Sequence, residues 1–383
     1  MKSKVFYLIS LTVLLVTLIS CAPAAAPVPT PKATTAATPG PVPVPNSNLP
    51  PLTSQDAAWA KIVEAAKKEG RLVVYGAAPF ANTGKDLSAA FSAQYGIPID
   101  MLILAGNQHL ERLRVERAIR QPVADITQTG ITTATQIVKD NLVENVVDTL
   151  PELRDRSLFQ VDPVYDPQKQ IIGFGITTLG ILINTNLVKP GEIKSWFDLL
   201  DPRWKGKIIM ADPRTTGTGL NMFSTLTYHK VVDYDYFRKL ADQKLTLWGG
   251  ATREMELMVG RGEYPVIFGI GSSVEPFILE GAPLKIIDPV EGSTAQPEPL
   301  MVVKDAPHPN AARLFANWIL SKEGQTAYNK QIGRLPLRKD LPDFTPEKIR
   351  RTYSKLWNRT WEAAEQSDKD LKSGIVEQIF GKK

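Results

Sequence analysis

The sequence contains almost no cysteine or histidine. Cys21 is the only cysteine among 383 residues, and the histidines are His109, His229 and His308. A single cysteine excludes a disulfide within the chain, and so few sulfur and imidazole groups exclude a closed Cys/His zinc site. The chain therefore has neither a disulfide framework nor a structural zinc site.

The chain also lacks a strong charge imbalance. Lysine and arginine number 45 against 40 aspartate and glutamate, and without Lys2 and Lys4 the balance is 43 against 40. No basic run or arginine-rich stripe stands out, so we expect a mixed, solvated surface and no nucleic-acid partner.

The N-terminus has the pattern of an export signal. Lys2 and Lys4 precede Val5–Ile19, a largely apolar run of 15 residues, which is shorter than the about 20 residues of a membrane span. Leu18-Ile19-Ser20-Cys21 then resembles the bacterial lipobox, which implies that Cys21 is acylated and becomes the mature N-terminus. The alternatives are an uncleaved anchor, or a signal cut elsewhere that leaves a free thiol.

Residues 22–53 follow the signal peptide (residues 1–21) and are rich in Pro, Ala and Thr. Ten of the 30 prolines fall between Pro23 and Pro51, and Lys32 is the only charged residue from 22 to 52. Such a segment cannot bury a core, and its prolines favour an extended polyproline conformation. We expect a spacer that holds a globular part away from a membrane.

From residue 54 onward, short apolar runs alternate with amphipathic stretches. The first block predicts helices over 56–69, 87–95 and 107–121, the last capped by Asn107, and strands over 71–76, 97–104 and 124–127. The second block predicts strands over 207–211, 245–248, 264–269 and 284–288, with helices over 217–228, 253–260 and 273–279. This alternation is typical of an α/β fold with a mostly parallel sheet.

Two β-rich stretches link the blocks. Residues 171–185 form a long run and residues 299–303 a short strand that leads back. We expect a hinged protein with lobe 1 over 54–175, lobe 2 over 176–298, and a return over 299–383. Its charged tail from Thr345 is expected to form one or two surface helices anchored by Trp357, Trp361 and Phe380. Ligands of open α/β sheets bind at the carboxyl ends of strands, here between the lobes.

Several stretches resemble one family. They are RLVVYGAAP, ADITQTG, GILINTN, SWFDLLDPRWKGKIIMADPRTTGTG and KDAPHPNAARLFANWILSKEGQTAY. They are similar to the substrate-binding proteins of ABC importers, in the branch that includes ferric-iron, thiamine, polyamine and phosphonate binders. Over residues 57–333 the resemblance implies a two-lobed, type II periplasmic-binding-protein-like fold. It also implies a monomeric receptor that captures a small solute and delivers it to a membrane permease.

The segment Asp212–Gly219 is the strongest candidate for a ligand site. It follows a predicted strand and opens a predicted helix, where free backbone N–H groups attract anions. Its members Arg214, Thr215, Thr216, Gly217 and Thr218 add donors or allow close approach. The alternative is a helix start that holds no ligand.

Other predicted strand ends supply further candidates. They are Ala77 and Ala78 after the first strand, Thr129 and Gly130 after the third, Thr177 on the long link, and Ser272, Ser273 and Glu275 after the strand at 264–269. Ordinary turns, and packing at the hinge for Thr177, are the alternatives.

A metal ligand set is missing from the sequence. The iron-binding members of the family use an adjacent tyrosine pair, which should follow the strand at 264–269, but Gly271-Ser272-Ser273-Val274 stands there and no Tyr-Tyr occurs in the chain. Glu116 matches the family's glutamate in position, although its helix favours a solvated residue. Ferric iron needs anionic oxygen ligands. We therefore expect no metal or cofactor, and an anionic or zwitterionic organic solute.

The function that these patterns favour is a lipid-anchored solute receptor in the cell envelope, outside the cytoplasm. Its partners would be the solute, the permease and, through Cys21, the membrane. Ferric-iron binding at a non-standard site is one alternative. An exported hydrolase is another, but the sequence has no G-x-S-x-G motif or comparable nucleophile arrangement.

Overall fold

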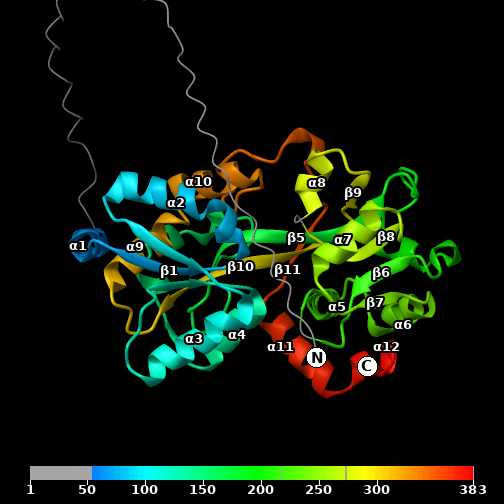
Figure 1. Ribbon diagram of the computed structural model, residues 1–383, viewed down its shortest axis with the longest axis horizontal. Helices are drawn as coiled ribbons and strands as arrows, with labels where there is room; N and C mark the ends of the chain where they lie inside the picture. Colours follow the sequence, from blue (N-terminus) through cyan, green and yellow to red (C-terminus); the bar gives the residue numbers. More distant parts are fainter. Residues whose placement is uncertain (1–53, 216, 272–273, 383) are drawn as a thin grey trace, which may run out of the picture. The chain divides into compact units, whose positions relative to one another are not determined.

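The computed structural model describes residues 54–215, 217–271 and 274–382, and these form two α/β lobes (Figure 1). Cys21 and the spacer lie outside the described residues, as do Thr216, Ser272 and Ser273. The strands of lobe 1 are β1 (Leu72–Gly76), β2 (Ile99–Ile103), β3 (Ile126–Gln128) and β4 (Val143–Glu144). Its helices are α1 (Ser54–Glu69), α2 (Ala78–Tyr95), α3 (Gly106–Ala118), α4 (Ile131–Lys139), α9 (Pro309–Trp318) and α10 (Lys322–Ile332).

Lobe 2 repeats the alternation. Its strands are β6 (Ile208–Ala211), β7 (Thr246–Trp248), β8 (Val266–Ile270) and β9 (Leu284–Ile287). Its helices are α5 (Thr218–Tyr228), α6 (Tyr234–Asp242), α7 (Thr252–Gly260) and α8 (Glu275–Leu279). Short 3-10 turns connect elements in both lobes, at Val147–Thr149, Pro151–Leu153, Arg156–Leu158, Trp196–Leu200, Pro202–Trp204 and Glu347–Ile349.

Two long strands, β5 (Ile172–Asn184) and β10 (Ser293–Val303), run through both lobes and pair with each other in antiparallel fashion. The strand order is β2-β1-β3-β10-β5-β8-β6-β7, with β4 and β11 (Leu356–Asn358) beside β10 and β9 beside β5. The predicted two-lobed α/β fold is thus confirmed, with β5 close to its predicted range. The sheet is mixed and not mostly parallel, because β10 and β5 also pair in antiparallel fashion with β3, β4, β8 and β9.

Alternating side chains on the buried strands enter different cores. Leu72 and Val74 of β1 pack with α1, α2, α9 and α10, while Val73 and Tyr75 pack with α3 and α4. Because a strand turns successive side chains to opposite faces, a strand buried on both sides must be apolar throughout. In lobe 2, Ile208 and Met210 likewise face α5 and α6, and their neighbour Ile209 faces α7.

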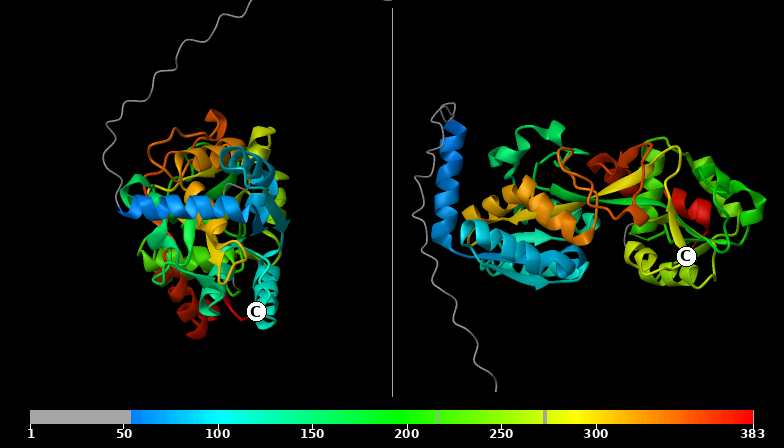
Figure 2. Two further views of the ribbon diagram at one scale, coloured as in Figure 1. Left: turned by 90° about the vertical axis from the view of Figure 1, so that its left-hand side faces the viewer. Right: turned by 90° about the horizontal axis from the view of Figure 1, so that it is seen from above.

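The chain after α10 passes repeatedly between the lobes (Figure 2). Leu337 packs in the core of lobe 1, Ile349 in that of lobe 2, Trp361 again in lobe 1, and Ile379 in lobe 2. The last two belong to α11 (Trp361–Lys372) and α12 (Ile375–Phe380). The tail therefore ties the two lobes together, and its helices contribute to both cores instead of lying only on the surface.

Several predicted boundaries are wrong, for identifiable reasons. Helix α2 begins at Ala78 instead of Leu87, because proline suits the first turn of a helix. Gly84 lies within this helix, where a Cβ would meet the side chain of Met101. Strand β10 begins at Ser293 instead of Pro299. Its prolines are accommodated by a register shift between Glu298 and Pro299. Helix α3 starts one residue before Asn107, with Ala105 at its N-cap.

Candidate functional site

The strand directions place four loops at one junction between the lobes. Strand β5 runs from lobe 1 to lobe 2, β8 is antiparallel to it, and β6 is parallel to β8. Strand β10 runs the opposite way, β3 is antiparallel to it, and β1 is parallel to β3. The carboxyl ends of β1, β3, β6 and β8 therefore all point toward the other lobe. Ligands of open α/β sheets bind at such ends.

The loop after β1 is tied to the end of β3. The N–H of Ala77, at the N-cap of α2, donates to Oε1 of Gln128 at 2.9 Å, and α2 begins at Ala78 without a side-chain cap. Two of the loops predicted from the sequence are thus brought together in lobe 1.

The loop after β3 contains an unusual buried hydroxyl. Thr129 is 1% exposed, and its Oγ1 has no hydrogen-bond partner within the described residues. Gly130 follows as an exposed N-cap of α4, again without a side-chain cap. A buried hydroxyl without a partner costs about 1–3 kcal/mol. Such a group is a candidate for contact with a ligand.

The loop after β6 holds Arg214 firmly. Its guanidinium donates to both carboxylate oxygens of Asp212, at 2.9 and 2.8 Å, and to the carbonyls of Gly381 and Lys382 at 3.3 and 2.9 Å. Thr215 donates to the carbonyl of Asp212 at 3.3 Å. Arg214 therefore already has a counter-charge, and its role toward a solute stays a prediction.

The glycines of this loop meet backbone requirements. Gly217, the N-cap of α5, has φ of +145°, which side chains rarely allow. A Cβ at Gly219 would lie 2.1 Å from the carbonyl oxygen of Ala211, so this glycine lets α5 pack against its own strand. Thr218 begins α5, which has no side-chain cap.

The loop after β8 leads to Glu275, which is 8% exposed. Burial raises the pKa of its carboxyl to about 7, although the nearby Arg334 and Arg351 act in the opposite direction. Both arginines have other carboxylate partners. Arg334 pairs with Glu298 at 2.9 Å, and Arg351 pairs with Asp288.

This group around Glu275 encloses little space. Thr178 and Tyr353 join it through a hydroxyl–hydroxyl hydrogen bond of 3.0 Å, and Arg351 donates to the hydroxyl of Thr178 at 2.8 Å. The enclosed cavity measures about 20 Å³, enough for one water molecule. Thr177 donates to Glu298 at 3.1 Å. Thr177 and Thr178 are thus both bonded to neighbouring side chains, and the role of Thr177 toward a solute stays a prediction.

A larger cavity of about 180 Å³, here called the α4–α5 cavity, lies between helices of the two lobes. Its lining carries charges of both signs, from Lys139 and Arg359 and from Glu365 and Asp368. The other lining residues include Ile131, Thr132, Asn221 and Ser367. It thus adjoins the first turn of α4, directly after Thr129 and Gly130, and the first turns of α5.

Arg359 is the distinctive group of this cavity. It is 3% exposed and donates only to neutral oxygens: the carbonyl of Asn221 at 3.2 Å, Thr225 at 3.3 Å and Ser367 at 2.9 Å. Its Nε has no partner among residues 54–215, 217–271 and 274–382. Nothing in the sequence pattern pointed to it, because an arginine in a charged tail looks like a solvated residue.

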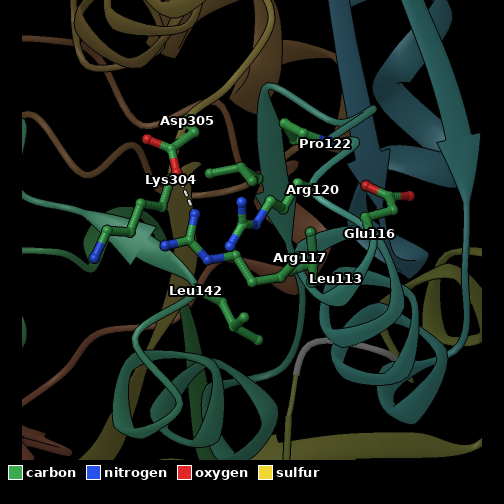
Figure 3. A pocket seen from close by; sticks show the side chains of 9 residues that line it. Leu113, Glu116, Arg117, Arg120, Pro122, Leu142, Lys304 and Asp305 are labelled. Carbon is green, nitrogen blue, oxygen red and sulfur yellow. Dashed lines mark hydrogen bonds and ion pairs between the residues drawn. The ribbon is translucent and has the colours of Figure 1, made fainter.

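A separate cavity of about 330 Å³ lies in lobe 1 (Figure 3). It is lined by the end of α3 and the end of β10, so it is at the opposite end of the lobe from the junction. Arg117, in an ion pair with Asp305, extends into it beside Arg120. Glu116 lies at its edge. The pattern of its helix predicts a solvated side chain, but this prediction is wrong. It is 6% exposed and accepts from the hydroxyl of Tyr75 at 2.5 Å, and burial helps to raise the pKa of Tyr75 to about 12.

Within the described ranges, no group of three or more His, Cys, Asp or Glu is arranged to hold a metal ion. No helix of that part of the chain is both long and apolar enough to span a bilayer.

Two α/β lobes joined by long crossing strands, with strand ends facing a shared junction, define a periplasmic-binding-protein fold of type II. The chain belongs to the family of bacterial extracellular solute-binding proteins, whose sequence model matches residues 121–357. The predicted membership of the ABC-importer substrate-binding proteins, in their iron and phosphonate branch, is thereby confirmed.

Three relatives illustrate this membership. A periplasmic protein of Salmonella typhimurium, named for binding 2-aminoethylphosphonate, is 24% identical over 261 residues, which cover 66% of this chain and 73% of that protein. The structure of AfuA from Actinobacillus pleuropneumoniae, with fructose-6-phosphate bound, has a TM-score of 0.58 at 23% identity and covers 81% and 97%. Ferric iron-binding protein A of Mannheimia haemolytica, in an open conformation, has a TM-score of 0.67 at 15% identity and covers 82% and 100%.

Proposed function

We propose that this protein captures a small anionic or zwitterionic organic solute between its lobes and delivers it to the permease of an ABC importer. It acts as a binding protein and not as an enzyme. The lipid on Cys21 would hold it at the outer face of a membrane, with residues 22–53 as a spacer.

One observation carries the choice of an anionic solute. Helices α2, α4 and α5 all begin at the junction, from both lobes, and none has a side-chain cap. The free N–H groups of a helix start, together with the helix dipole, favour negative charge. The buried, unpartnered hydroxyl of Thr129 lies next to the start of α4 and offers another donor.

Two relatives support the same class of solute. One is named for an aminophosphonate and another holds a sugar phosphate, and both of these molecules carry a tetrahedral oxyanion. Among the predicted ligand-binding residues, Thr129, Gly130, Gly217 and Thr218 have the surroundings expected of a contact, and they are our first choices for substitution.

The experiment is a comparison of solution scattering with and without solute, on protein purified under native conditions. Native mass spectrometry first identifies any co-purified molecule. A panel of 2-aminoethylphosphonate, fructose-6-phosphate and short carboxylic acids is then titrated. We expect compaction and 1:1 binding with at least one oxyanion, without turnover. Failure of the whole panel, and of any co-purified molecule, to compact the protein contradicts the proposal.

The β6–α5 loop is tested separately. Arg214→Ala combined with Thr216→Ala should weaken binding of the identified solute if this loop belongs to the site. Unchanged affinity would remove the loop from the site while leaving the receptor function intact.

Ferric iron is the second candidate, because a relative of the same fold is named as a ferric iron-binding protein. Stoichiometric iron in the natively purified protein, retained against citrate, would favour it over an organic solute.

The lipid anchor has its own test. Wild-type protein should incorporate a palmitate analogue in cells and fractionate with membranes, whereas Cys21→Ala should do neither.

A further inference from the structure

Arg359 is a buried cation that forms no ion pair with a carboxylate within the described part of the chain, although the residue is only 3% exposed. Asp368 is near enough to favour its charged form, but this carboxylate is bonded to Lys139 at 2.9 Å. Burial lowers the pKa of Arg359, which is the direction expected when charge is poorly compensated.

Other buried or half-buried arginines of the protein have carboxylate partners. Arg214, Arg334, Arg338 and Arg351 have side chains 5–24% exposed, and each contacts at least one carboxylate. Removing a charge from water is expensive unless it is paired, so an arginine left with neutral acceptors is costly for the empty protein. Such a cost is understandable when an external anion completes the pairing.

The position of Arg359 gives an anion access to it. Arg359 is one of the residues that line the α4–α5 cavity, together with the first turn of α4 and Asn221 of α5. The carboxylates Glu365 and Asp368 line it as well, and Asp368 is paired with Lys139. Helix α4 has nine residues and starts at Ile131, with Gly130 as its N-cap and no side-chain cap, so its dipole also favours negative charge here. The cavity of about 180 Å³ has room for a phosphate group or a short carboxylic acid.

We infer that Arg359 and the α4–α5 cavity form an oxyanion site, in which a carboxylate, phosphonate or phosphate group accepts hydrogen bonds from the guanidinium and neutralises it. The inference rests on the proposed function in one respect, since the oxyanion is taken to be part of the captured solute. It assigns the charge recognition to the C-terminal segment, which joins both lobes, instead of to the loop of Arg214.

The test uses the full-length protein and three simple probes: inorganic phosphate, methylphosphonate and acetate, titrated calorimetrically in a chloride buffer. At least one probe should bind to the wild-type protein. Arg359→Gln should weaken that binding about 10- to 100-fold, as expected for loss of a charge-assisted, two-point contact. Arg203→Gln is the matched control, since this arginine is exposed on lobe 2 and its variant should bind like the wild type.

A second variant covers the possibility that Arg359→Gln does not fold. Asn221→Asp is nearly isosteric and adds a carboxylate to the lining of the same cavity. It should weaken phosphate binding while raising the thermal midpoint without phosphate, because an internal anion then faces Arg359.

The outcomes separate this site from the receptor function. Binding that is equal in wild type, Arg359→Gln and Asn221→Asp overturns the oxyanion site, as does the absence of binding by all three probes. If the wild-type protein compacts with a solute and Arg359→Gln compacts with equal affinity, the receptor stands and the site fails. If phosphate binds through Arg359 but no solute compacts the protein, the site stands and the receptor function fails.

Discussion

Arg214 in the β6–α5 loop and Arg359 in the C-terminal segment are both shielded arginines, but only Arg214 has an anionic partner. Two nitrogens of Arg214 donate to the carboxylate of Asp212, and the third donates to the backbone carbonyls of Gly381 and Lys382. Arg359 meets only neutral oxygens and leaves its Nε unused within the described part of the chain. A satisfied arginine stabilises the fold, whereas an unsatisfied one is available for an external anion.

The contrast shows that neither the residue type nor the surrounding sequence motif decides which arginine has a carboxylate partner. Arg214 lies in the stretch that most resembles a ligand-binding loop, yet its neighbour two residues earlier neutralises it. Arg359 lies in an unremarkable tail, but tertiary packing buries it away from every described carboxylate that could pair with it.

The largest expected effect comes from breaking the Arg214 pair. Asp212→Ala leaves a shielded cation without its partner and should lower the free energy of unfolding by about 3–5 kcal/mol in urea titrations. Adding Arg214→Ala should recover a large part of the loss. Asp235→Ala, which removes an exposed ion pair, is the control and should cost less than about 1 kcal/mol. A cost below 1 kcal/mol for Asp212→Ala would show that the pair does not hold the loop.

Glu275 is a buried carboxylate that can be compared with these arginines. The two arginines near it are paired with other carboxylates. Its folded pKa is about 7 against an ordinary 4.5, so the folded protein holds this proton more tightly than the unfolded chain. The contribution of Glu275 to the free energy of unfolding should therefore be largest below pH 4.5 and should fall as the pH rises toward 7. The full loss is at most about 3 kcal/mol above pH 7.

Glu275→Gln tests this directly. The variant should be more stable than the wild type at pH 8 and should lose part of its advantage at pH 5, as measured by urea unfolding at both values. The charged groups that face Glu275, namely Arg334, Arg351, Asp288 and Asp343, remain in place. An equal difference at the two pH values would mean that Glu275 titrates normally.

A paired substitution compares the two arginines themselves. Arg359→Met should change the stability of the solute-free protein by no more than about 1 kcal/mol, because an uncompensated charge is replaced by an apolar chain of similar length. Arg214→Met should cost about 2–3 kcal/mol, since Asp212 is left buried. Both variants are measured by thermal and urea unfolding. Equal losses of stability would contradict the conclusion that Arg214 is paired and Arg359 is not.

The smallest effect is expected at the edge of the α4–α5 cavity. Lys139 and Asp368 join α4 to α11, but their side chains are 43% and 49% exposed. Lys139→Ala should therefore lower stability by less than about 0.5 kcal/mol, because exposed ion pairs are screened and lose side-chain freedom. A larger loss in a urea titration would indicate that this contact helps to hold the lobes together.

Much of the fold could be predicted because local patterns carry it. Strands buried on both faces are continuous apolar runs, and amphipathic helices alternate with them, so β1, β6 and β8 were found within one or two residues. The start of α2 and the length of β10 were not found. There, Gly84 and the prolines of β10 oppose local propensity, and contacts with distant residues override it.

The candidate site was predictable only as a set of loops. The strand-end rule identifies the segments after β1, β3, β6 and β8, and the antiparallel crossing of β5 and β10 makes them face one another. The pairing of Arg214, the burial of Thr129 and the placement of Arg359 depend on residues up to 168 positions apart in the chain. No local window of sequence contains that information.

The sequence by itself determined the fold class, the family and the loops in which a solute would be sought, because these follow from local hydrophobic periodicity and from motifs. Only the tertiary structure decided which charges are paired and which are left open. Pairing depends on the distance between groups that are far apart in the chain and on their burial, as with Arg359 of the tail and the α4–α5 cavity. Electrostatic free energy is set by that environment, whereas the sequence shows only the identity of each charge.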